Sequence, residues 1–449
     1  MLISPLLFSP SHPASVQSHA LLLLVFVAGG LVLELGLHPQ THLRDLARLP
    51  GWLRAHWEVL IAWALLAGVI VSSALAPDPA VAFTGNPSEG SDSAVWFAGL
   101  VAVFSLVYVR ARQDRGLASR LAGAALASAG LLAVGAVTEV GVGHSVFSWV
   151  LGEPGPSAGD MPLMTFPQKG HLAGYLALGG ALAFVLGLRH QGRARPVTLA
   201  IALCALLGLG LGVTENRSAV LALGVAVVIS LLLYLLARRV EGKSRPFAPS
   251  LSLLPGSLGL AAAVLLSVGA GTLFAESRNA HAKVLSDTTT GTTRSVLWRA
   301  AGRGIAARPL TGWGGGQFHT HWFTFVSPQE LEVFMQGEYR QHVITHVGNV
   351  LLVQERSGKK HPVYVTAWKA HNQILDVGVM YGIPVALLYL LLFLAALRNW
   401  RQAPALAAAL CAYGVFLVFW YMTENAEGAV FALWGALAAS GGGAGVRQG

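Results

Sequence analysis

The chain has 449 residues, of which 54% are hydrophobic and only 11% are charged, and its mean hydropathy is +0.59. Soluble domains carry about 25% charged residues, so this composition excludes a soluble enzyme and indicates a protein of the lipid bilayer. The formal net charge of +9 would suit a nucleic-acid-binding protein, but most basic residues fall in loops between apolar segments. No nucleic-acid partner is therefore expected.

Apolar segments long enough to cross ~30 Å of hydrocarbon recur along the chain. They are expected at residues 20–38, 57–76, 94–109, 117–138, 171–188, 196–213, 217–237, 251–274, 372–397, 403–421 and 427–441. Helices are the only single segments that satisfy their backbone polar groups in lipid. The pattern predicts an all-α polytopic membrane protein with about 11–12 transmembrane helices. Its expected parts are N-terminal helices (1–274), one large extracytoplasmic loop domain (275–371), and C-terminal helices with a short cytoplasmic tail (372–449).

The connections between these segments alternate in charge. The stretches "APDPAVAFTGNPSEGSDS" and "TENAEG" contain acidic residues but no Lys or Arg, whereas the alternate connections are basic. By the positive-inside rule, the basic connections are cytoplasmic and the N-terminus lies outside. The basic residues in question are Arg44, Arg48, Arg54, Arg110, Arg112, Arg115, Arg120, Arg189, Arg193, Arg195, Arg238, Arg239, Lys243, Arg245, Arg398 and Arg401.

The connection at residues 275–371 differs from the other external ones, because it is long and holds eleven Lys and Arg residues. Long loops are translocated regardless of charge, so the predicted topology stands. Helix-like stretches and aromatic residues in this loop predict an ordered structure, and its "NVLLVQE" and "HPVYVTAW" segments around "RSGKK" predict a hairpin. Arginine binds phosphate bidentately, so this lobe suits an anionic substrate that carries sugars.

The short junction "GVTENRSAVLAL" contains the first candidate for a functional site. Thr214 or Asn216 is expected to cap the following helix, which places Arg217 in its first turn. A cation at the already positive end of a helix makes an anion-binding site. The alternative is an interfacial arginine that reaches toward lipid headgroups.

The second candidate is Arg294 in "TTTGTTRSVLWRAAGRGIAARPLTGWGGGQF". Thr292 or Thr293 is expected to cap a helix that has Arg294 in its first turn and ends before Arg308-Pro309. Trp298 follows Arg294 by four residues and so lies on the same helix face. The alternative is an ordinary solvated amphipathic helix.

The third candidate, His371, stands where the long loop meets the apolar run, in "TAWKAHNQILDVGVMYGIP". A neutral imidazole there can accept a proton from a hydroxyl group, and Asn372 can orient a ligand or cap the helix. The alternative is a histidine that only satisfies a backbone group at the interface. No Asp-x-Asp pair occurs in the first external loop, so no metal or other cofactor is expected, and arginines would meet the charge of a phosphate leaving group.

Five segments, in order along the chain, resemble the O-antigen ligase and polymerase superfamily of bacterial glycan transferases. The last one matches its signature of His-Asn, nine residues and then Gly. The segments are "AFTGNPSEGSDSAVWFAGL", "MTFPQKGHLAGYLAL", "TENRSAVLAL", "TRSVLWRAAGRGIAARPLTGWGGGQF" and "AHNQILDVGVMYGIP".

This resemblance implies a metal-independent, inverting glycosyltransferase that uses an undecaprenyl-pyrophosphate-linked glycan as donor. Carried over, it makes Arg217 and Arg294 the pyrophosphate-binding residues and His371 the catalytic base, with Asn372, Trp298 and Asn216 in support. The expected location is the bacterial inner membrane, with the active site on the periplasmic side.

Ligation of the glycan to lipid A-core is the favoured reaction, and polymerisation of repeat units is the first alternative, since both reactions share donor and leaving group. Transfer to protein hydroxyl groups is a more distant alternative. So is a transporter of lipid-linked sugars, although such proteins are expected to show internal repeats and polar residues within their helices.

Overall fold

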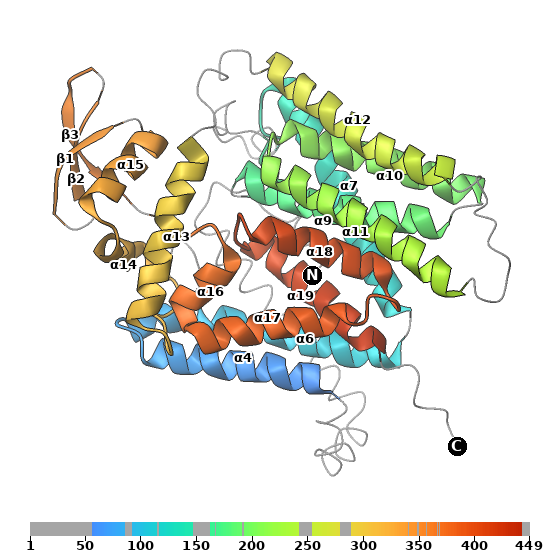
Figure 1. The fold of residues 1–449 in the computed structure, drawn as a ribbon, viewed down its shortest axis with the longest axis horizontal. Coiled ribbons are helices and arrows are strands. Elements are labelled where there is room, and N and C mark those ends of the chain that lie inside the picture. The colour runs from blue at the N-terminus through green and yellow to red at the C-terminus, as the bar shows by residue number, and fades with distance from the viewer. Residues whose placement is uncertain are drawn as a thin grey trace, which may run out of the picture.

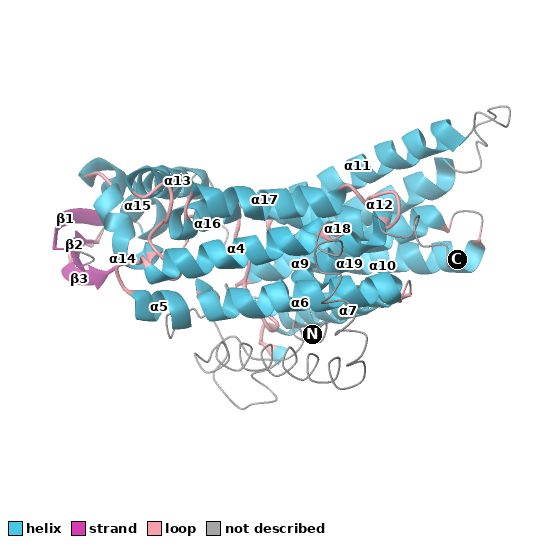
Figure 2. Cartoon of the chain, turned by 90° about the horizontal axis from the view of Figure 1, so that it is seen from below, coloured by secondary structure: helices cyan, strands magenta, loops and turns pink. Residues whose placement is uncertain are grey.

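The computed structural model describes residues 56–441 except 86–91, 115, 147–161, 167, 191–192, 242–253, 279–288, 340, 348–349, 356, 366 and 368. The expected segment 20–38 lies outside these residues. The described chain forms a long bundle of helices with a smaller lobe at one end (Figures 1 and 2). The predicted helical membrane fold is confirmed, since seven described helices are long and apolar enough to cross a membrane.

Seven of the predicted apolar segments correspond to single long helices in the described part of the chain. The structure places these helices at α4 (Trp57–Ala74), α6 (Ala94–Gln113), α7 (Leu117–Val142), α9 (Lys169–Arg189), α10 (Ala194–Val213), α11 (Arg217–Glu241) and α12 (Leu254–Arg278). A short helix, α5 (Pro79–Thr84), follows α4. Helix α9 is almost entirely buried, so it forms the centre of the bundle, as Figure 1 shows.

The C-terminal part contains the shorter helices α17 (Ile383–Leu397), α18 (Pro404–Leu417) and α19 (Glu424–Ala439). The prediction of one continuous helix at 372–397 is wrong, because the structure divides this segment into α16 (Gln373–Tyr381) and α17. Gly382 separates the two helices with a φ of 88°, a region that favours glycine. A Cβ atom at Gly382 would lie 2.4 Å from the carbonyl oxygen of Leu310, so the lobe packs directly against this break.

The lobe consists of α13 (Thr289–Ala307), α14 (Phe318–His321), the 3-10 turn Trp322–Phe325, α15 (Pro328–Tyr339) and a three-stranded sheet. The strands β1 (His342–Val347), β2 (Val350–Gln354) and β3 (Lys360–Tyr364) are antiparallel, in that order. The predicted hairpin is confirmed as β2–β3, and β1 extends it beyond what the sequence indicated.

Charge pairs hold the lobe together. Glu330 in α15 accepts hydrogen bonds from Arg299 at 2.7 Å and from Arg303 at 2.6 Å, both in α13. The Arg303 guanidinium holds the pKa of Glu330 well below its usual range. These contacts fix α15 on the helix that carries Arg294.

Backbone hydrogen bonds attach the lobe to the bundle through the "GWGGG" turn. The amides of Trp313 and Gly314 donate to the carbonyl oxygens of Val379 at 3.0 Å and Met380 at 2.7 Å. Gly314 adopts a φ of 93° to make this approach. Ser72 of α4 also donates to the Met380 oxygen, at 3.1 Å. The turn therefore anchors the end of α16, the helix that follows His371.

Candidate functional site

His371 occupies a strained turn at the start of α16. Its φ is 56°, in the left-handed region, which costs a residue with a Cβ atom about 1–2 kcal/mol. The buried carboxylate of Asp376 accepts hydrogen bonds from the amides on either side, Ala370 at 2.6 Å and Asn372 at 3.4 Å. Asp376 thus holds the backbone that presents the imidazole.

Asn372 caps α16, which is one of the two roles predicted for it. Its Oδ1 accepts from the amides of Ile374 and Leu375, both at 3.1 Å. Its Nδ2 donates to the carbonyl oxygen of Val418 at 2.9 Å, beyond the end of α18. Both polar atoms of the Asn372 side chain therefore form hydrogen bonds within the fold. They connect the His371 turn to the α18–α19 connection.

Replacing Asp376 with Asn is expected to disturb the His371 turn while the protein still folds. The Asn amide has only one acceptor oxygen for two backbone donors, and an unsatisfied buried donor costs about 1–3 kcal/mol. We expect kcat for the protein's reaction to fall by about tenfold to a hundredfold, since small misplacements of catalytic groups are costly. KM for the donor should stay unchanged. An unchanged kcat, with thermal unfolding shifted, would show that Asp376 is only structural.

Two aromatic residues between α18 and α19, Trp420 and Tyr421, lie at the centre of the site; we call them the aromatic pair. The His371 ring makes edge contacts with both, at centroid distances of 5.4 Å and 5.2 Å. The guanidinium of Arg294 lies over the Trp420 ring at 5.3 Å, and Lys369 Nζ lies 5.2 Å from the Tyr421 ring. The aromatic pair therefore brings together cations and imidazole from distant parts of the chain.

A second histidine, His171, contacts the same aromatic pair. It lies in the first turn of α9, is only 2% exposed, and its ring centroid is 5.0 Å from that of Trp420 and 4.7 Å from that of Tyr421. Neither ring nitrogen has a hydrogen-bond partner among the described residues. The structure thus places two histidines around one pair of rings.

Arg294 reaches the site from within α13 rather than from its first turn. The predicted cap at Thr292 or Thr293 is wrong, because the helix begins at Thr289. Thr293 is buried inside the helix, and this packing overrides the local capping preference of threonine. Arg294 Nη1 donates to Ser218 Oγ at 3.5 Å, which connects α13 to the start of α11.

Arg217 is the first residue of α11, as predicted, and it is exposed. Asn216 acts as the predicted cap, since its Oδ1 accepts from the amide of Ala219 at 2.9 Å. Because Ser218 contacts Arg294, the two predicted arginines belong to adjoining surfaces. Trp298, one turn beyond Arg294, packs near Phe419 with a centroid distance of 6.5 Å.

The electrostatic environment keeps His371 neutral. Burial, reinforced by the nearby charges of Arg294 and Lys369, lowers the pKa of His371 to about 4. Lys369 is itself buried and forms an ion pair with Asp92. At neutral pH the site therefore offers an uncharged imidazole beside a cationic guanidinium, which is a base next to an anion-binding group.

Comparison with known proteins assigns this part of the chain to a family. Residues 202–390 match the family model described as O-antigen ligase. The chain carries an O-antigen ligase domain. The match, together with the seven described helices long and apolar enough to cross a membrane, supports a membrane protein of the O-antigen ligase family. A search among curated proteins found no match to this chain.

The O-antigen ligase domain contains Arg217, Arg294 and His371, but other residues of the site lie outside the matched range. His171 precedes it, and the aromatic pair follows it. Sequence reasoning missed these three residues and also Lys369. Their signals were weak: a lone histidine at a helix start, two aromatics at the end of an apolar run, and one lysine among many in a basic loop.

Proposed function

We propose that the protein transfers a glycan from an undecaprenyl-pyrophosphate carrier to a hydroxyl group of lipid A-core, with inversion and without a metal ion. The observation that carries this proposal is the position of Arg294 and His371 on the same Trp420 ring, at 5.3 Å and 5.4 Å. An anion-binding group and a base side by side are what transfer from a pyrophosphate leaving group needs.

In the proposed step, His371 accepts the proton of the acceptor hydroxyl while the hydroxyl oxygen bonds to the anomeric carbon of the donor sugar. The bond from that carbon to the pyrophosphate oxygen breaks with its electron pair. Arg294 and Arg217 stabilise the negative charge that remains on the lipid pyrophosphate. Because the oxygen attacks opposite to the leaving group, a single displacement inverts the anomeric carbon.

The position of the site in the bundle supports a lipid-borne donor. Arg217 and His171 lie in the first turns of α11 and α9, two apolar helices long enough to cross a membrane. A pyrophosphate held at these helix ends would keep its polyprenyl chain beside the apolar helix surfaces. The adjoining lobe, with its arginines and aromatic side chains, supplies a surface for sugars.

The periplasmic side is proposed from the charge pattern. Arg112, Arg189 and Arg401 line cavities between helix ends, and α9, whose first turn holds His171, ends at Arg189 on the far side of the bundle. Basic loops remain in the cytoplasm, so the lobe and His371 would face the periplasm of a bacterial inner membrane.

A transfer assay tests the choice of acceptor. Purified protein in EDTA would receive a glycan linked to undecaprenyl pyrophosphate, with and without lipid A-core. Ligation predicts glycan on the core and no change in donor length when the core is omitted. Donor glycans that lengthen without core would instead identify a polymerase, and an absolute need for added Mg²⁺ would refute the metal-independent mechanism.

A further inference from the structure

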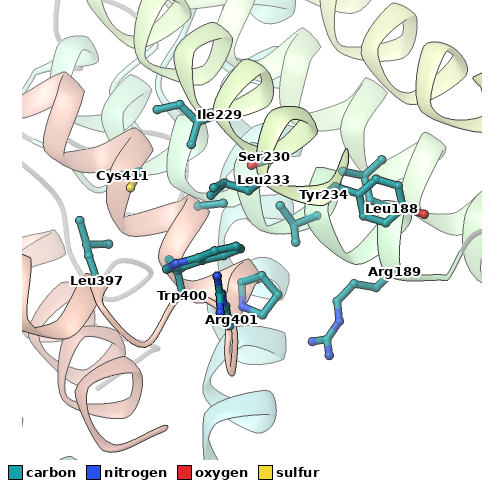
Figure 3. Close-up of a pocket in the computed structure, with 14 residues that line it drawn as sticks. Leu188, Arg189, Ile229, Ser230, Leu233, Tyr234, Leu397, Trp400, Arg401 and Cys411 are labelled. Atoms are coloured by element: carbon teal, nitrogen blue, oxygen red, sulfur yellow. The ribbon is translucent and has the colours of Figure 1, made fainter. Parts of the chain in front are cut away.

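A cavity separate from the candidate site lies between the C-terminal end of α9, α11 and the α17–α18 hairpin (Figure 3). The candidate site lies at the opposite end of α9, where His171 is in the first turn. The volume of the cavity is about 540 Å³, and its wall is mainly apolar, with Leu233, Leu397 and Trp400 among the lining residues. Volumes of 300–1,000 Å³ are typical of ligand sites. A chain-like apolar group fits this space.

The cavity opens toward the outside of the bundle. The C-terminal half of α11 diverges from its neighbours (Figure 2), and the apolar side chains Val228 and Leu232 of this helix are 56% and 54% exposed. A second apolar cavity of about 300 Å³ shares Ile229 and Cys411 with the first. The two cavities adjoin one another at these residues, and we call the pair the α11–α18 groove.

Two arginines stand at the far end of this groove. Arg189 ends α9 and Arg401 lies in the α17–α18 connection, and Figure 3 shows both guanidinium groups on the same side of the cavity. Both side chains are exposed, and neither forms an ion pair with any residue that the structure describes. Arg401 lies over the ring of Trp400 at 5.3 Å.

Two other arginines at this end of the bundle form ion pairs. Arg398, in the same connection as Arg401, pairs with Glu58 at 2.6 Å and lies over Trp57. Arg120 pairs with Asp114 at the start of α7. The α11–α18 groove therefore combines a long apolar wall with two arginines that form no ion pair with a described residue, which matches a molecule that has an anionic head and an apolar tail.

We propose that the α11–α18 groove binds a phospholipid with an anionic headgroup, from the leaflet at the end of the bundle opposite the lobe. Arg189 and Arg401 would contact the phosphate, Trp400 would lie at the level of the headgroup, and an acyl chain would follow the apolar wall. Basic residues near an anionic leaflet attract such lipids. This inference is independent of the proposed glycan transfer.

Native mass spectrometry of the full-length protein tests the inference, with phosphatidylglycerol and zwitterionic phosphatidylcholine as probes. The wild type is expected to retain phosphatidylglycerol in preference to phosphatidylcholine. Arg189→Gln/Arg401→Gln should weaken its binding by about fivefold for each arginine replaced. The control Arg120→Gln/Arg195→Gln removes the same charge at the same end of the bundle but away from the groove, and should change binding by no more than about twofold.

A groove-filling variant separates a lipid from a bare anion. Ser230→Phe leaves both arginines in place but occupies the apolar part of the groove, so it too should weaken phosphatidylglycerol binding. Equal retention of the two lipids, or equal loss in the control and the Arg189→Gln/Arg401→Gln variant, would overturn the inference. Binding lost only in Ser230→Phe would also overturn it, because the groove would then hold an apolar tail with its head elsewhere.

Discussion

His371→Ala is expected to lower the rate of glycan transfer by about 10²–10⁴-fold, the usual contribution of a general base. The imidazole is neutral because burial and the neighbouring charges of Arg294 and Lys369 lower its pKa. His171 contacts the same aromatic pair from α9, but His371 is the histidine whose pKa the charge of Arg294 helps to lower. Steady-state kinetics of transfer from the lipid-linked donor would measure the loss.

The matched control is His346→Ala, which removes an exposed histidine of β1 and should leave the rate unchanged within about twofold. A His371→Ala protein that folds normally and transfers glycan at a wild-type rate would show that the base is another group. His171→Ala would then become the decisive variant.

The pH profile follows from the same environment. A protonated imidazole cannot accept a proton, so the rate falls as pH drops through the pKa of His371. For the free protein this pKa is about 4, which places the acid limb of kcat/KM there. Bound pyrophosphate offsets the charge of Arg294 and raises the pKa, so the acid limb of kcat should lie at higher pH. Acid limbs at the same pH would contradict the proximity of base and leaving group.

Arg294→Ala carries the second large expected effect. Loss of one preorganised group that stabilises developing charge reduces kcat by about 10²–10³-fold. Arg294→Lys should recover only part of this loss, because an ammonium group lacks the planar, bidentate geometry of guanidinium. The measurement is again transfer kinetics at saturating donor, with KM determined separately.

Arg299→Ala provides the control for Arg294. It removes a charge from the same helix, while Arg303 continues to hold Glu330, so the attachment of α15 is preserved. Equal losses of activity in both variants would attribute the effect of Arg294 to the stability of the lobe rather than to the leaving group.

Much of the fold could be predicted from the sequence because its signals are local. Apolar length predicted the long helices, the residues around "RSGKK" predicted the β2–β3 hairpin, and Asn216 and Asn372 cap their helices as their positions indicated. The division of the segment 372–397 was missed, because Gly382 is needed only where the lobe backbone at Leu310 approaches it. That approach is a tertiary contact.

The candidate site could likewise be predicted only in part. Arg217, Arg294 and His371 each stand at a recognisable junction, so the sequence could nominate them. Trp420, by contrast, contacts His171 and His371 from a connection far along the chain. Such contacts depend on how α9, α13, α16 and α18 pack together. No spacing in the sequence encodes them.

The most direct test of the account is the affinity of the protein for undecaprenyl pyrophosphate, measured for the wild type, Arg294→Ala and His371→Ala. Hydrogen bonds to charged groups contribute about 1.5–3 kcal/mol, so Arg294→Ala should bind at least about tenfold more weakly. His371→Ala should bind within about twofold of the wild type while transfer is lost. Unchanged affinity in Arg294→Ala, or equal weakening in both variants, would contradict the proposed division between leaving-group binding and proton transfer.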